Sequence, residues 1–94
     1  MNNNNEDYGY LSITASTLVD NGPGQLGGIF VSSVSGTPTI TIYDNLTASG
    51  AAPGGTIAAQ FTPVAGTPYP FPARYSQGLY VAIGGTVNAT VFFN

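Results

Sequence analysis

The sequence predicts an all-β fold, a small antiparallel β-sandwich or jelly-roll-like barrel of about seven to eight strands. Three observations support this prediction. Apolar and polar residues alternate with a period of two in several short runs, as they do in strands that bury one face. Thirteen Gly and seven Pro separate these runs. Nowhere do apolar residues recur at the i, i+3, i+4, i+7 spacing of an amphipathic helix.

Residues 38–43 (PTITIY) alternate most clearly, with Ile40 and Ile42 on one face and hydroxyl-bearing side chains on the other. Gly84-Gly85 predicts a two-residue hairpin turn between the last two strands of the chain. The same alternation predicts the other strands at residues 8–15, 27–34, 56–61, 78–83 and 86–93.

The segments between these strands are rich in turn-forming residues. Residues 21–28 (NGPGQLGG) include a Gly-rich loop, and Asp44-Asn45 opens a turn because both side chains can bond local backbone. Residues 62–73 contain four prolines, which have no amide hydrogen for a central strand. We therefore predict an edge strand or an extended crossing loop there. Long Gly/Pro connections of this kind suit Greek-key or jelly-roll crossings.

One face of these strands is predicted to form the core. The expected core residues are Leu11, Ile13, Ile29, Val31, Ile40, Ile42, Ile57, Phe61, Leu79, Val81, Ile83, Val87, Val91 and Phe93, and residues 56–61 are expected to turn Ala59 inward as well.

The opposite faces are not purely polar. A strand face that mixes aromatic rings with Thr and Ser, and lacks Lys and Glu, resembles the centre of a protein interface. The alternative is that these rings form cross-strand pairs covered by the Pro-rich segment. Arg74, the only cation, either pairs with an acid across a subunit contact or lies in a loop. The candidate interface residues are Tyr10, Phe30, Tyr43, Tyr80, Phe92 and Arg74.

The 94 residues are enough for one domain. We expect a single β-sandwich domain at residues 8–94 and a flexible N-terminal arm at residues 1–7 (MNNNNED), which have no apolar residue after Met1. The chain has no Cys and no His, so disulfides and the usual zinc ligands are excluded. Association with other chains is the remaining common way to stabilise so small a core.

Composition also excludes several functions. Only 5% of the residues are charged, and one Arg cannot form a basic patch for nucleic acid. No apolar run approaches the roughly 20 residues of a membrane helix. A Ser or Thr nucleophile would lack its usual general base because the chain has no His or Lys, and no Cys is available as a nucleophile. Asp20 and Asp44 lie in predicted turns. We therefore expect a non-enzymatic protein with no catalytic residue, metal or cofactor.

Two runs, TPTITIYDNLTASG (37–50) and PYPFPARYSQGLYVAIGGTVNATVFF (68–93), resemble a pattern in small virion proteins of tailed bacteriophages. The pattern is a strand ending in YDN, a small-residue loop, an aromatic-Pro stretch, GLYV, a Gly turn and a terminal strand. The resemblance covers nearly all of residues 26–93. It implies a jelly-roll or sandwich domain, made in the host cytoplasm, that binds the capsid exterior as a decoration (cement) protein. It implies a homotrimer whose partner is the major capsid protein or another virion protein, and no catalytic residue.

Related domains also serve as head-fibre or tail-fibre modules, which gives a second hypothesis. In a fibre or lectin-like module, Tyr69, Phe71 and Tyr75 in the Pro-rich segment would stack on the sugar rings of a glycan or on a host receptor.

Overall fold

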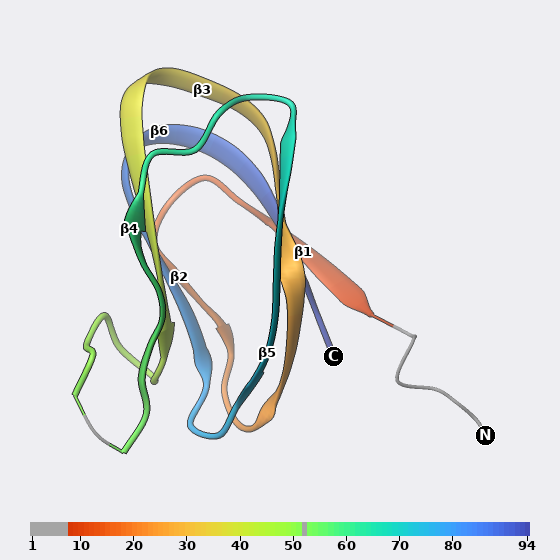
Figure 1. Ribbon diagram of the computed structural model, residues 1–94, viewed down its shortest axis with the longest axis vertical. Helices are drawn as coiled ribbons and strands as arrows, with labels where there is room; N and C mark the ends of the chain where they lie inside the picture. The colour runs from red at the N-terminus through yellow and green to blue at the C-terminus, as the bar shows by residue number, and fades with distance from the viewer. Residues whose placement is uncertain (1–7, 52) are drawn as a thin grey trace.

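The computed structural model describes residues 8–51 and 53–94 and contains six strands (Figure 1). The all-β prediction is confirmed, and every pairing is antiparallel. The predicted N-terminal arm, residues 1–7, lies outside the described residues. The strands are β1 (Gly9–Ile13), β2 (Thr17–Asp20), β3 (Gly24–Asp44), β4 (Gly55–Phe61), β5 (Thr67–Tyr75) and β6 (Leu79–Phe93).

Two long strands form the centre of the sheet. β3 has 21 residues, β6 has 15, and they pair with each other from Leu26↔Phe93 to Tyr43↔Tyr80. The sheet order is β1-β6-β3-β4, while β2 also pairs with β6 and β5 also pairs with β3. Each long strand therefore has a different outer neighbour along its two halves.

Both long strands bend in the middle, and Figure 1 shows them arching over at the top of the view and descending on the other side. The β3–β6 register shifts between Ser35 and Thr39 at this bend. Gly36 and Gly85 lie there with φ of 72° and 88°, a region that glycine enters without the steric cost of a Cβ.

The bend divides the sheet into two arms. The first arm contains β1, residues 89–93 of β6, residues 24–31 of β3, and β5. The second arm contains β2, residues 79–83 of β6, residues 40–44 of β3, and β4.

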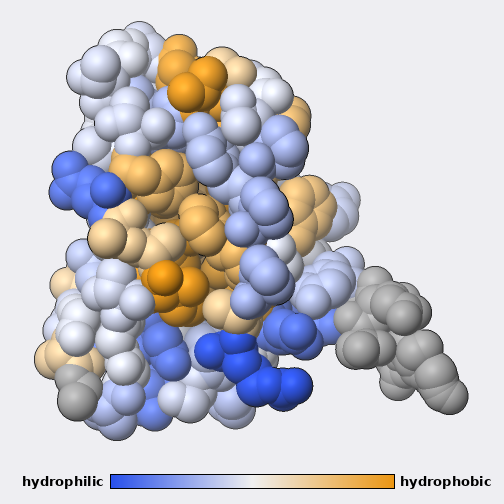
Figure 2. All heavy atoms as spheres, viewed as in Figure 1, coloured by the Kyte–Doolittle hydropathy of each residue, from blue (hydrophilic) through white to orange (hydrophobic). Residues whose placement is uncertain are grey.

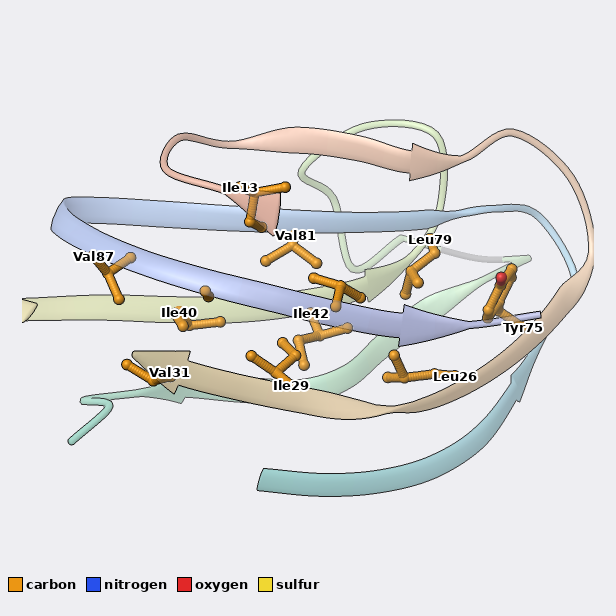
Figure 3. Close-up of a cluster of buried hydrophobic side chains, with 12 residues drawn as sticks. Ile13, Leu26, Ile29, Val31, Ile40, Ile42, Tyr75, Leu79, Val81 and Val87 are labelled. Atoms are coloured by element: carbon orange, nitrogen blue, oxygen red, sulfur yellow. The ribbon is translucent and has the colours of Figure 1, made fainter. Parts of the chain in front are cut away.

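The core lies between the two arms. Figure 3 shows side chains from both halves of β3 and β6 pointing toward one another, and they belong to one buried cluster. Each arm turns one apolar face toward the other arm. The alternate apolar residues of both arms are therefore buried in the same core. The buried cluster is Ile13, Leu26, Ile29, Val31, Ile40, Ile42, Tyr75, Leu79, Val81, Val87, Ala89 and Val91.

The predicted hairpin at Gly84-Gly85 is wrong. Residues on both sides of these glycines pair with β3 and not with each other, so residues 78–83 and 86–93 belong to the single strand β6. The predicted strands 27–34 and 38–43 are likewise continuous in β3. In both cases a glycine bends a strand that goes on pairing, which explains why there are six strands and not the predicted seven to eight.

Three further segments differ from expectation or decide between alternatives. β2 was not predicted, because its four residues (TLVD) are too few to alternate visibly and its register is interrupted by a bulge. In β4, register shifts turn Ala58 toward the core and leave Ala59 exposed, against the predicted pattern. Residues 62–73 contribute to β5, which is an edge strand that pairs only with β3.

The predicted core is largely present, with differences at the sheet margins. Ile57, Phe61, Ile83 and Phe93 are partly buried against the cluster, and Leu11 is 37% exposed. Within the described ranges, no helix is long and apolar enough to cross a membrane.

Candidate interaction surfaces

Three of the predicted interface residues lie together on the outward face of the first arm. Tyr10 is opposite Phe92 on neighbouring strands, and their ring centroids are 6.5 Å apart. Phe30 lies on the next strand, where it is opposite Pro68 on one side and Thr90 on the other. Tyr10 is 71% exposed, Phe92 39% and Phe30 37%. These rings project from the sheet away from the buried cluster.

A shallow groove of about 430 Å³ runs across the same face. Gly27 and Gly28 keep its floor low, since a Cβ at Gly28 would lie 2.7 Å from the Tyr69 carbonyl oxygen and one at Gly27 would meet the Tyr8 ring at 3.1 Å. The lining contains no charged or amide side chain. It consists of Tyr8, Gly27, Gly28, Ile29, Phe30, Pro68, Tyr69, Pro70 and Phe92.

Arg74 lies on β5, opposite Gln25 and exposed. It is the only charged residue in the strand segments of the first arm. Within residues 8–51 and 53–94 the structure gives it no ion-pair partner, so its predicted acid partner remains a prediction about a neighbouring chain.

The other two predicted interface residues lie on the second arm. Tyr43 and Tyr80 are opposite each other on β3 and β6, and both are partly buried. Leu18 of β2 is opposite Tyr80 and is 37% exposed. The five predicted rings therefore form two separate groups on different arms, a division that alternation along single strands could not reveal.

The three rings of the second hypothesis do not lie on an exposed loop. Tyr69 and Phe71 are partly buried on β5 and pack against Phe61 of β4, with ring centroids 5.1 and 5.6 Å apart. Figure 2 shows apolar colour gathered between β4 and β5, where side chains close this side of the molecule. The Tyr69 hydroxyl also accepts a hydrogen bond from the Val64 amide at 2.8 Å.

Tyr75 is a core residue, only 2% exposed. Its hydroxyl donates a 2.7 Å hydrogen bond to Asp20 of β2, which links the first arm to the second. Burial, and then the hydrogen bond and charge of Asp20, raise the pKa of the Tyr75 hydroxyl well above its usual value. The sequence signal for these positions is the alternation in TPYPFPARY, in which the three rings are at positions 69, 71 and 75 and so fall on the same face of an extended strand.

The Asp44 carboxylate bonds a loop that is distant in the sequence, and not the backbone of the turn that Asp44 begins. Its carboxylate accepts hydrogen bonds from the backbone amides of Ser76, Gln77 and Gly78 at 2.8 to 3.4 Å. Burial raises the pKa of this carboxyl, but the three amides and the Ser76 hydroxyl outweigh it, so the pKa lies below its ordinary 3.8. Asn45 does bond locally, to the Leu46 amide and the Ser49 carbonyl, as predicted.

Acidic residues do not gather in the described part of the chain, where no three acidic, His or Cys side chains could hold a metal ion together. The carboxylates of Asp44 and Asp20 are engaged in the structural hydrogen bonds given above. The candidate contact surface in residues 8–51 and 53–94 is the exposed aromatic face of the first arm with its groove. In comparisons with known proteins, no family model, curated protein or solved structure matches this chain.

Proposed function

We propose that this protein is a non-enzymatic virion structural protein, a capsid decoration protein that self-associates and binds the exterior of a phage head. The observation that carries the proposal is the outward face of the first arm. It combines exposed aromatic rings with a groove whose lining has no charged side chain. Exposed apolar patches of this kind usually mark contact with another protein.

We further propose that the fold is a jelly roll. If β3 and β6 are each counted as two strands at their bends, eight segments result. Their order is β1, β6 (89–93), β3 (24–31), β5 in one arm and β2, β6 (79–83), β3 (40–44), β4 in the other. Two four-stranded sheets connected in this way are the arrangement of jelly rolls, which are common in viral capsid proteins and lectins. This connectivity supports a virion role on fold-level analogy alone.

The groove favours a protein partner over a glycan. Sugar recognition needs polar side chains around the stacked ring, and the groove offers only tyrosine hydroxyls. Tyr69 and Phe71 pack inward against Phe61, and Tyr75 is buried. The three rings that the fibre or lectin hypothesis requires for stacking on a sugar are therefore not exposed for that contact.

Two measurements test the proposal. Sedimentation velocity from about 1 to 500 µM should show reversible self-association, because small protein interfaces form weak, transient complexes. Virions produced with this chain should resist heat or chelators better than virions produced without it. Capsids of equal resistance, together with a strict monomer, would contradict the proposed role.

A further inference from the structure

The sheet has four edges, and they differ in how well they are protected from pairing with another strand. An edge strand presents unpaired N–H and C=O groups, which proteins usually block with prolines, charges, bulges or short length. The edge strands of this sheet are β1 and β5 in the first arm and β2 and β4 in the second.

The edge of β5 is blocked by prolines. Pro68, Pro70 and Pro72 are spaced two residues apart, so their nitrogens point to the same side of the strand. The ladder with β3 continues past Pro68 and Pro70, opposite Phe30 and Gly28, so the donors in that ladder come from the residues between them. The prolines therefore face the free edge, which has carbonyl acceptors but no donors over this stretch.

The two edges of the second arm are irregular. β4 shifts register with β3 twice along its seven residues, and such bulges bend an edge away from a flat partner. β2 has four residues, contains a shift before Asp20, and carries that charge at its end. Each of these edges shows at least one of the usual protective features.

The β1 edge has no proline, charge or bulge, although the strand has only five residues. Gly9 to Ile13 pair with β6 in unbroken register, and the strand contains no Pro and no charged side chain. Four of its five residues are exposed. No described segment other than β6 pairs with it, so one side of its backbone has no strand partner within residues 8–51 and 53–94.

We propose that β1 pairs with β1 of a second copy of this chain, antiparallel and centred on Leu11. An extended backbone is the only common structure that matches a row of alternating donors and acceptors, and an antiparallel strand is its own complement about a two-fold axis. The central position of Leu11 lets all five residues of each strand pair. The absence of charge on β1 removes like-charge repulsion between the copies.

This pairing has a consequence for the proposed function, on which it rests. A two-fold axis that relates antiparallel strands of one sheet is perpendicular to the sheet, so both first arms turn the same face outward. The Tyr10–Phe92 pairs of the two copies then lie on one continuous apolar surface, twice as wide as that of a single chain. The inference gives a dimer as the unit that binds the capsid, whereas the resemblance implies a homotrimer.

Amide hydrogen exchange by NMR tests the pairing without altering the chain. The β1 amides that bond β6 should be protected at every protein concentration, and the alternate β1 amides should become protected only as the protein associates. Association with free exchange at those alternate amides would overturn this inference and leave the proposed function standing. A monomer at all concentrations would overturn both.

A charge-swap pair of variants tests the register. With Leu11 on the axis, position 10 of one copy lies opposite position 12 of the other, and Tyr10 and Ser12 are both exposed. Tyr10→Lys with Ser12→Lys places like charges opposite each other and should weaken association about tenfold more than Tyr10→Lys with Ser12→Glu, which places opposite charges there. Both variants lose the same ring, so equal weakening of the two would overturn the inference.

Discussion

The outward faces of the two arms both include parts of β3 and β6, but their aromatic rings are exposed to different degrees. On the first arm, the facing rings of Tyr10 and Phe92 and the ring of Phe30 are exposed, and a groove lined by Phe30, Phe92, Gly27 and Gly28 crosses this face. On the second arm, Tyr43 and Tyr80 lie directly opposite each other and are partly buried. A pair of facing rings is therefore part of an exposed surface on the first arm and is partly buried on the second.

The strongest test of this comparison places a charge on each outward face, at two side chains with the same exposed fraction. Phe30 and Leu18 are both 37% exposed, on the first and second arms respectively. Phe30→Asp should weaken binding to the phage capsid about 100-fold, because a charge in the centre of an apolar contact must be desolvated. Leu18→Asp should change it less than about threefold. Co-sedimentation with capsids that lack this chain measures both, and the reverse ranking would assign the capsid contact to the second arm.

The floor of the groove gives the next largest effect, on stability. Gly28→Ala should lower the free energy of unfolding by about 2 kcal/mol, because its Cβ would lie 2.7 Å from the backbone oxygen of Tyr69, which cannot easily move. Gly27→Ala is the matched control: its Cβ would meet the Tyr8 ring at 3.1 Å, and a side chain can give way. Urea denaturation compares the two, and an equal cost would show that the glycine floor is not tightly packed.

Removing the hydrogen bond between Tyr75 and Asp20 tests how far the two arms depend on each other for stability. Tyr75→Phe should lower the free energy of unfolding by about 1.5 kcal/mol, because it leaves a partly buried Asp20 carboxylate without its donor. The raised pKa of Tyr75 stabilises the fold below the ordinary pKa of about 10, and this contribution is lost as pH rises toward the folded value. Between pH 8 and 11, the midpoint temperature of thermal unfolding should therefore fall with pH more steeply in the wild type than in the variant.

The smallest effect is expected at Asp44, which fastens the loop at residues 76–78 between the arms. Its lowered pKa means that its contribution is present above the ordinary 3.8 and is lost as pH falls through the folded value. Asp44→Asn should cost about 1 kcal/mol at pH 7, since the group is partly exposed. The difference from wild type should shrink below pH 4 in chemical denaturation. A constant difference at all pH values would mean that the carboxylate charge contributes nothing.

Local alternation in the sequence was enough to predict the β class, six segments that lie in the four strands β1, β3, β4 and β6, and most of the core. The same local signal could not reveal that a Gly-Gly pair bends a continuous strand, because Gly84-Gly85 is equally compatible with a hairpin until the partner of each half is known. It also could not place the candidate interface on one arm. Phe30 and Tyr43 lie on the outward face of the same strand, β3, and only the bend between them sends them to different surfaces.

The Pro-rich segment shows the opposite case, because its residue spacing already indicates which side chains are buried. Tyr69 and Phe71 alternate with three prolines, and that spacing alone places the rings on one face and the prolines on the other. In an exposed loop these rings would be candidates for glycan stacking, whereas in an edge strand the periodicity indicates that they are buried. Tyr75 follows the same period and is in the core.

The bend in β3 and β6 also has a mechanical consequence. Because both arms share two uninterrupted backbones, neither arm can slide past or peel away from the other without extending covalent chain around the bend at Gly36 and Gly85. A load applied to one outer surface is carried through the polypeptide itself to the opposite surface. Such a molecule is suited to yield as a whole or not at all, and two glycines set the place where its curvature is concentrated.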